Sequence, residues 1–340
     1  MIHNKFTTGF LLSCSLALFS QNSSESSDSL LRFELQASIE TTPVVSSEDA
    51  ADDVCVWVSN DPSAPIFVIG TDKKRGLETY NEHGERIFDA PFGRINNVDL
   101  WNSEIGPIVV GTNRTTNTLD FYELDTLNGS LALLNRYATG LTDVYGITVR
   151  DGKPSEVFIS DKKGTVQRYA TSLIDRFVSA RLTDTFKFSS IVEGLEIDPF
   201  YNRLYVAEEN KGMYYLDLLA TKPKKVKFAS TDNELLVADL EGLALLDQGL
   251  GNGYLAVSVQ GANSYALFDR EDLSLRAIFQ IVENENGIGS VEETDGIDIS
   301  THPRYGYFIA QDGFNGTDNQ NYKWVSIIQL LEFLSGLQDN

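Results

Sequence analysis

The sequence is poor in cysteine. Among its 340 residues only Cys14 and Cys55 carry a thiol. Cys14 lies in an N-terminal segment that we expect to be removed, so the mature protein should contain no internal disulfide bond. Cys55 lies between Val54 and Trp57 in an apolar stretch, which predicts a core position in a strand.

Positive charge is also scarce. The chain has 27 Lys and Arg against 49 Asp and Glu, a formal net charge of −22. A surface of this sign repels nucleic acid and anionic lipid, so we expect no nucleic-acid partner. It would also repel an anionic small-molecule substrate. Such a substrate needs a locally positive site, and bound cations could provide one.

Long apolar runs are absent except at the N-terminus. The run Gly9–Phe19 follows Lys5 and precedes the polar stretch Ser20–Ser29. This is the layout of a secretory signal. No other run approaches the roughly 20 apolar residues that a membrane-spanning helix needs, so we expect no membrane span.

The predicted organisation is therefore a signal peptide over residues 1–20, a polar linker over 21–33 and a single domain over 34–340. It implies a secreted or periplasmic protein. Two alternatives stay open for the first segment: a lipoprotein acylated at Cys14, and a buried N-terminal helix.

Six copies of one unit follow one another along the rest of the chain. Each copy is a short apolar strand that runs into polar residues, and successive copies lie about 40 to 50 residues apart, a period typical of propellers and solenoids. The copies are Phe67–Lys74, Ile108–Arg114, Val157–Lys163, Leu204–Asn210, Leu255–Gly261 and Tyr307–Gly313.

These repeats predict an all-β fold, a six-bladed β-propeller with about four antiparallel strands per blade. We expect it to be a monomer. Residues 325–337 are the one place where the sequence favours a helix, although a late strand could instead return to complete the first blade.

A second column of residues precedes the first, with one polar or acidic side chain just before another strand in each copy. Its members are Asp53, Asn97, Tyr145, Glu193, Glu241 and Asp295, and the last four are each followed by glycine. Radial packing of blades turns each column into a ring around the axis. The two columns should therefore meet in one small volume.

Carboxylates dominate this volume in the second half of the chain. The first column adds Glu208, Glu209, Gln260 and Asp312, and Asp52, Asp99 and Asp239 lie nearby. Crowded acids are stable only when cations or protons neutralise them. Oxygen ligands without histidine or thiolate select calcium or magnesium, and calcium accepts the larger, less regular set.

Basic side chains take the same places in the first three copies. They are Lys73, Lys74, Arg114, Lys162 and Lys163. One half of the channel opening at the axis is therefore basic and the other half acidic. This favours a polyanionic ligand held between fixed cations and protein-bound calcium.

These residues resemble successive landmarks of the β-propeller phytases, the calcium-dependent alkaline phytases of the 3-phytase type. The matching motifs include Asp52-Asp53, Gly70–Leu77, Gly93–Asp99, Asn113-Arg114, Val144–Gly146, Glu193-Gly194, Ala207–Glu209, Asp239–Leu243, Ser258–Gly261, Thr294–Asp298 and Ala310–Gly313. They keep the family's order from about Glu40 to about Val325.

The resemblance implies calcium-dependent hydrolysis of phytate, myo-inositol hexakisphosphate, to lower inositol phosphates. By matched position, phosphate would contact Lys73, Arg114, Tyr145 and Lys162, with Lys74, Lys163 and Asn97 also assigned to substrate binding. The calcium ligands would be Glu193, Glu209, Asp239, Glu241 and Gln260 in the active site, and Glu40, Asp52, Asp53, Val98 through its carbonyl, Asp295 and Asp312 at further positions.

Two positions depart from the family pattern. Lys163 stands where the family commonly has an acid, which puts one metal or phosphate position in doubt, and Val54 replaces a usual proline. Around residues 315–321 the match is too weak to transfer any role.

The expected reaction is attack on the phosphomonoester by a calcium-activated water. The sequence lacks the motifs of covalent phosphatases. His83 lies in Glu82-His83-Gly84 rather than Arg-His-Gly, and Asp61 occupies the place six residues after Cys55 where an arginine would be needed. A calcium-dependent propeller lactonase or esterase and a non-catalytic inositol-phosphate-binding propeller remain alternatives.

Overall fold

The computed structural model describes residues 30–59, 61 and 64–336. The expected signal peptide, most of the expected linker and Cys14 lie outside the described residues. The first strand, β1 (Leu31–Gln36), begins inside the segment expected to be linker.

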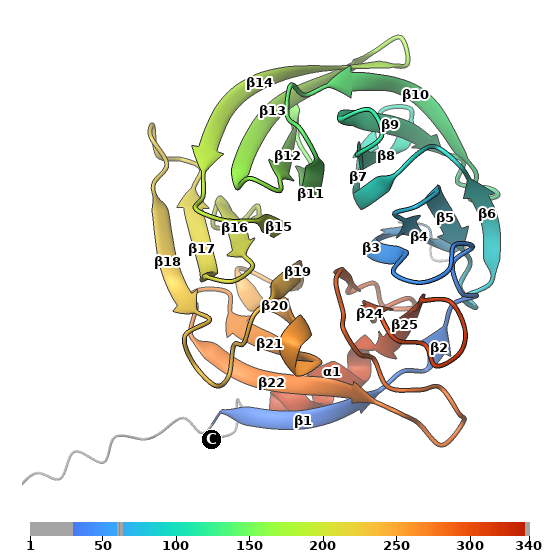
Figure 1. Ribbon diagram of the computed structural model, residues 1–340, viewed down its shortest axis with the longest axis vertical. Coiled ribbons are helices and arrows are strands. Elements are labelled where there is room, and N and C mark those ends of the chain that lie inside the picture. Colours follow the sequence, from blue (N-terminus) through green and yellow to red (C-terminus); the bar gives the residue numbers. More distant parts are fainter. Residues whose placement is uncertain (1–29, 60, 62–63, 337–340) are drawn as a thin grey trace, which may run out of the picture.

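Six sheets are arranged around one axis, as Figure 1 shows, which confirms the predicted six-bladed propeller. Apart from the two N-terminal strands β1 and β2, the strands of each blade are antiparallel neighbours in chain order from the inside outward, because short turns join them. Blades 1 to 3 consist of β3 (Ala51–Val58), β4 (Ile66–Asp72), β5 (Gly76–Tyr80) and β6 (Arg86–Ala90); β7 (Ile95–Ser103), β8 (Gly106–Asn113), β9 (Thr118–Leu124) and β10 (Leu131–Ala138); and β11 (Val144–Arg150), β12 (Ser155–Asp161), β13 (Thr165–Ile174) and β14 (Phe177–Lys187).

The second half of the ring repeats this plan. Blades 4 to 6 contain β15 (Val192–Asp198), β16 (Arg203–Glu208), β17 (Gly212–Asp217) and β18 (Lys225–Ser230); β19 (Leu240–Gly249), β20 (Asn252–Val259), β21 (Ser264–Asp269) and β22 (Leu275–Val282); and β23 (Ile297–Ser300), β24 (Tyr307–Asp312) and β25 (Asn321–Ser326). A short 3-10 turn, Gln260–Ala262, follows β20.

N-terminal strands complete the last two blades. β2 (Ile39–Glu40) pairs antiparallel with β25 and supplies the fourth strand of blade 6, while β1 adds a fifth, parallel strand outside β22. The ring is therefore closed by an early strand in the last blade, not by a late strand in the first. The C-terminal residues are free to form the helix α1 (Ile327–Ser335), as the sequence favoured.

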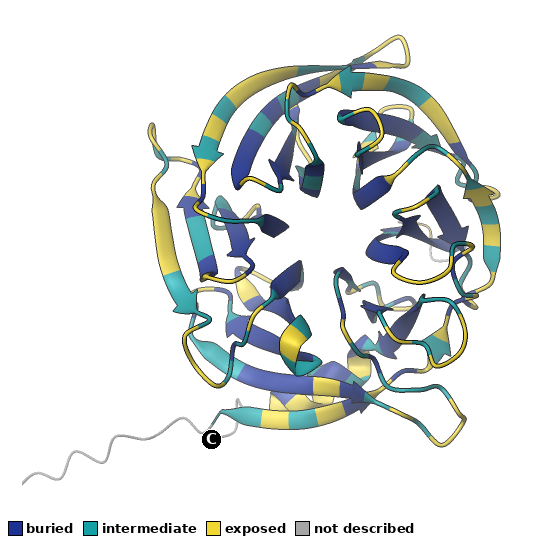
Figure 2. Ribbon diagram, in the orientation of Figure 1, coloured by how far each residue is buried: buried dark blue, intermediate teal, exposed yellow. Residues whose placement is uncertain are grey.

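The apolar core lies between adjacent blades. Cys55 of blade 1, for example, is buried in one cluster with Val98 and Tyr122 of blade 2. Figure 2 shows the inner strands buried and the outer strands alternating between buried and exposed residues, as expected for strands with one solvated face. The predicted core position of Cys55 is confirmed.

A buried ion pair joins blades 4 and 5. The Arg270 guanidinium donates to both carboxylate oxygens of Asp198 over 2.8 and 2.9 Å, and the two side chains are 1% and 0% exposed. No helix among the described residues has the length and apolar character needed to cross a membrane.

Candidate active site

The inner strands of blades 1 to 5 share a β-bulge near their first residues. The pairing with the second strand shifts between Ala51 and Val54, and at the equivalent points of the next blades, Ile95/Val98, Val144/Ile147, Val192/Leu195 and Leu240/Leu243. A bulge leaves residues unpaired and turns their side chains out of the normal alternation. Here the same change of side-chain direction occurs in one blade after another around the axis.

The first residue of each bulge belongs to one ring. In blade order the ring contains Asp52, Asn96, Tyr145, Glu193 and Glu241, with Asp295 at the matching place before β23. The sequence column was therefore off by one residue in the first two blades, where it used Asp53 and Asn97. The doubled residues Asp-Asp and Asn-Asn hid the correct register.

The second bulge position is crowded. In the last four blades it is glycine, and a Cβ added at Gly194 would lie 2.0 Å from the backbone oxygen of Glu241 in the next blade. The glycines of this column are thus required by the close approach of neighbouring blades. In the sequence these glycines look like ordinary turn residues, but the structure shows that the packing of neighbouring blades requires them.

A second ring follows the second strand of each blade. Its residues are identified by one repeated hydrogen bond, in which the amide donates to a carbonyl just before the inner strand: Lys73 to Ala50, Arg114 to Arg94, Lys162 to Asp143, Glu209 to Ile191, Gln260 to Asp239 and Gly313 to Glu292. This ring is basic in three consecutive blades and carries oxygen ligands in the next two, as the sequence predicted.

The sixth member of this ring is Gly313 rather than Asp312. The carboxylate of Asp312 is fully buried and accepts from the Lys323 ammonium at 2.6 Å and from the Glu292 amide at 3.0 Å. Glu208 likewise accepts from the amides of Ser189 and Ser190. Both carboxylates accept hydrogen bonds from nearby backbone amides, and neither lines the main cavity described below.

Three carboxylates form the centre of the acidic side. One oxygen each from Glu193, Glu209 and Glu241 can be chosen so that all lie within 4.8 Å of one another, and all three residues are buried. Burial and the charge of Asp52 raise the pKa of Glu193, and burial and the charge of Glu209 raise that of Glu241. Burial and then the charge of Asp239 raise the pKa of Glu209 to about 7.

One oxygen in this cluster has no hydrogen-bond partner. It is Oε2 of Glu241, which is also shielded from solvent. A buried carboxylate oxygen without a donor is costly unless a cation reaches it. The cluster therefore offers the oxygen ligands that a hard cation prefers, and one of these oxygens has no other partner.

Lys73 is the first cation on the basic side. Its ammonium lies 2.6 Å from Asp49, 2.7 Å from Asp52 and 3.4 Å from Asp295. Burial alone would lower the pKa of Lys73, but the charges of Asp52 and Asp295 raise it above the ordinary value. Gln260 in turn donates to the other oxygen of Asp295 at 2.6 Å, so the chain of contacts reaches the acidic side.

Tyr145 lies between two further cations. The Lys162 ammonium is 4.2 Å from the centre of its ring, and the Arg114 guanidinium carbon is 5.8 Å from it. Burial and then the charge of Glu193 raise the pKa of Tyr145, so the phenol stays protonated and donates to Glu193. The Nε of Arg114 donates to Asp143 over 2.8 Å.

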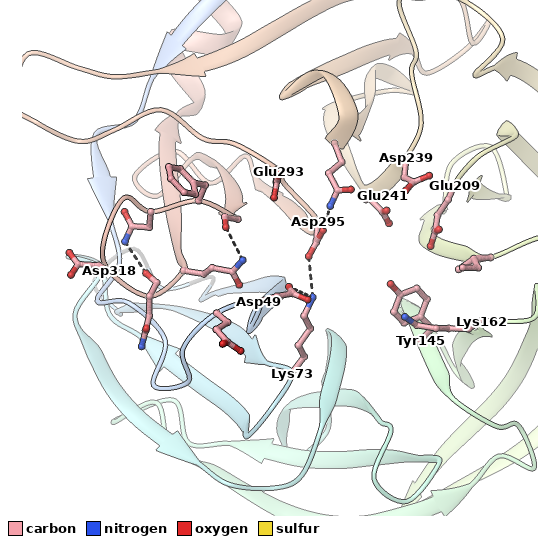
Figure 3. A pocket seen from close by; sticks show the side chains of 18 of the residues that line it. Asp49, Lys73, Tyr145, Lys162, Glu209, Asp239, Glu241, Glu293, Asp295 and Asp318 are labelled. Atoms are coloured by element: carbon pink, nitrogen blue, oxygen red, sulfur yellow. Dashed lines mark hydrogen bonds and ion pairs between the residues drawn. The ribbon is translucent and has the colours of Figure 1, made fainter.

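Most of these side chains line one cavity of about 650 Å³ (Figure 3). Of the predicted site residues, it is lined by Lys73, Tyr145, Lys162, Glu209, Asp239, Glu241, Gln260 and Asp295. It also exposes acids that the sequence did not single out, namely Glu48, Asp49, Glu293 and Asp318. In Figure 3, Glu209, Asp239 and Glu241 face Lys73, Tyr145 and Lys162 across the opening.

Other predicted site residues lie apart from this cavity. Asp53, Asn97, Val98 and Glu193 line a separate cavity of about 40 Å³ among the inner strands, together with Asp99 and Asp298. There the Val98 amide donates to Asp53 over 3.0 Å.

Asp52 and Arg114 line neither of these two cavities and contact Lys73 and Asp143, respectively. Three further predicted site residues are at the surface. Glu40 is exposed on β2, where Asn321 donates to its carboxylate. Lys74 contacts Glu48, and Lys163 donates to Thr142, both at the protein surface.

Comparisons with known proteins agree with this geometry. The family model described as Phytase matches residues 4–339. A 3-phytase of Bacillus subtilis (strain 168) is 34% identical over 337 residues, which cover 90% of this chain and 87% of the relative. A solved luciferin-regenerating enzyme shares the fold alone, with a TM-score of 0.56 and 10% identity over 84% of this chain and 95% of its own.

The chain belongs to the phytase family. It is accordingly an enzyme of the phosphoric monoester hydrolase class, which a pocket with fixed cations on one side and a carboxylate cluster on the other is suited to be.

Proposed function

We propose that this protein hydrolyses phytate to lower inositol phosphates and phosphate, and that it needs calcium to do so. The observation that carries the proposal is that the ammonium groups of Lys73 and Lys162 line the same cavity as the carboxylates of Glu209, Asp239 and Glu241. Membership of the phytase family and the 3-phytase relative support phytate as the substrate.

The acidic wall fits calcium. Glu193, Glu209 and Glu241 present oxygens within 4.8 Å of one another, and Glu241 keeps one buried oxygen without a partner. Asp239 and Gln260 line the 650 Å³ cavity together with Glu209 and Glu241, and would add a carboxylate and an amide oxygen. No soft ligand is present in this set, which disfavours zinc and copper.

Further calcium ligands are proposed on the sequence match. They are Asp52 and Asp295 next to Lys73, Asp53 and the Val98 carbonyl between the inner strands, and Glu40 on β2. Asp312 is not proposed again, because Lys323 and backbone amides occupy its carboxylate.

Bound calcium would neutralise the acids, attract the polyanionic substrate and lower the pKa of a water in contact with it. The chain's own residues would do the positioning. Lys73, Lys162 and Arg114 would donate to phosphate oxygens, and their charge would stabilise the charge that develops as the ester bond breaks. Tyr145, held protonated between Arg114 and Lys162, would fix the two cations in place.

Lys74 and Lys163 are proposed as outer contacts for the remaining phosphates, because both are exposed next to a phosphate-contacting lysine. Asn97 is not suited to touch substrate, since it faces the small inner cavity. Secretion or export to the periplasm and a monomeric state are also proposals, which cell fractionation and sedimentation of the purified protein would test.

The test is phosphate release from phytate by the purified protein, with calcium and after chelation. Removal of calcium should abolish release, and its return should restore it. Lys73→Ala or Arg114→Ala should lower kcat/KM by about 100-fold or more, as loss of a charge-stabilising donor does elsewhere. Lys153→Ala removes an exposed lysine paired only with Glu104 and serves as the control. Full activity in chelator would contradict the proposal.

A further inference from the structure

Asn96 connects acidic and basic side chains of the two rings. It is the blade 2 member of the bulge ring, and its side chain is fully buried. Its amide nitrogen donates to Asp52 over 2.6 Å and to Glu193 over 3.0 Å, and also approaches Asn97 at 2.8 Å. Its oxygen accepts from the Arg114 guanidinium over 3.0 Å.

Only an amide can make this set of contacts. An amide NH₂ group donates twice and accepts nothing, whereas the amide oxygen only accepts. Reversing the amide would place the NH₂ group against the Arg114 guanidinium and the oxygen against two carboxylates. The contacts therefore fix one orientation of the Asn96 amide, in which its nitrogen faces two carboxylates and its oxygen faces the Arg114 guanidinium.

The contact with Asn96 also limits where Arg114 can point. The guanidinium is held at Nε by Asp143 and at Nη1 by Asn96, and its side chain is only 14% exposed. Asp143 is partly exposed, so water can compete for that contact, but the Asn96 side is dry. A hydrogen bond to a charged group is stronger where water is excluded.

We propose that Asn96 is a positioning residue that couples the carboxylates of the cation site to the arginine of the phosphate site. It is too deeply buried to touch substrate. It fixes the positions of Asp52 and Glu193 relative to Arg114. A cation bound by the carboxylates and a phosphate bound by the arginine are then held at a fixed spacing. The inference rests on the proposed function for the cation site, for the phosphate contact of Arg114 and for the substrate.

The test uses the full-length protein with Asn96→Leu, which is close in shape but neither donates nor accepts. With calcium and phytate, kcat/KM should fall about 10- to 100-fold, the usual effect of losing hydrogen bonds to charged groups. Asn135→Leu is the matched control, because Asn135 also donates to and accepts from one residue of the next blade, Val178, but far from the cavity. It should lower only the melting temperature.

A double-mutant cycle separates positioning from mere packing. If Asn96 acts through Arg114, Asn96→Leu should cost less than threefold in an Arg114→Lys background. Equal losses in both backgrounds, or wild-type activity in the single variant, would overturn the proposal. If Asn96→Leu does not fold, the smaller Asn96→Ser takes its place in the same cycle.

Binding of inorganic phosphate to the calcium-loaded protein, measured by calorimetry, gives the same cycle without turnover. There Asn96→Leu should weaken binding about tenfold, and again only when Arg114 is present. If the wild-type protein released no phosphate from phytate, the proposed function would fail. The phosphate-binding cycle would still decide the role of Asn96.

Discussion

Replacing Glu241 by glutamine should change protein stability in opposite directions with and without calcium. Glu241 is 5% exposed, its Oε2 has no hydrogen-bond partner, and it belongs to the cluster with Glu193 and Glu209. Glutamine keeps the shape of the side chain and removes its charge. In chelator it therefore relieves repulsion, and with calcium it removes a ligand.

The size of the first effect follows from the geometry. Two unit charges 4.8 Å apart repel by about 3.5 kcal/mol at an effective dielectric constant near 20. If Glu241 is instead protonated, the folded state must hold a proton that the unfolded chain releases, and this cost is of similar size. For a domain of this length, about 3 kcal/mol corresponds to a rise in melting temperature of about 5 °C.

The assay is thermal unfolding at pH 8 of wild type and Glu241→Gln, each in chelator and in millimolar calcium. The variant should melt higher than wild type in chelator and lower in calcium, because it loses part of the stabilisation that a bound cation gives by linkage. A shift of the same sign in both conditions would refute the assignment of Glu241 to a cation site.

Four further predictions concern the same architecture. Calcium binding should release more protons at pH 6 than at pH 8.5, because the raised pKa of Glu209, about 7, keeps it protonated below that pH; calorimetry in two buffers would detect this, and equal release at both pH values would contradict it. By the same shift, the chelated protein should lose stability as pH rises from about 4.5 to 7. Arg270→Met should cost about 3 to 5 kcal/mol by leaving Asp198 buried and unpaired, with kcat unchanged; an unaltered melting temperature would count against it. Gly194→Ala should lower both stability and activity, because its Cβ would meet the Glu241 backbone oxygen at 2.0 Å; wild-type behaviour would contradict the blade contact.

The fold was predictable because each blade repeats the same strand pattern. The six copies and their spacing gave the blade number and the two rings, and the structure confirms the propeller. The mode of closure was not predictable, since β2 has only two residues and no pattern of its own. Its place is decided by pairing with β25, a contact between opposite ends of the described chain.

The two rings of side chains around the axis were predictable to within one residue. The basic and acidic halves follow from Lys73, Arg114, Lys162 and Glu209, which occupy equivalent turns. Asn96 was missed because bulges shift the strand register, and a doubled asparagine offers no signal about which member turns inward.

Asp312 was misplaced for a related reason. The last residue of the second strand and the next residue are both polar in most blades, yet only the latter faces the axis. A useful signal would have been the glycine that follows the first bulge position in the later blades. Aligning the first two blades to that glycine points to Asp52 and Asn96. The loop acids such as Asp49 lie outside the repeat and could not be found from it.

The most direct test of the central claim is calorimetric titration of inorganic phosphate into the protein, once in chelator and once loaded with calcium. We propose that acids of the later blades bind calcium and that calcium completes a phosphate site to which Lys73, Arg114 and Lys162 contribute. Phosphate binding should therefore be measurable only in the calcium-loaded protein. Equal affinity in both conditions would show that the two halves of the cavity do not act together.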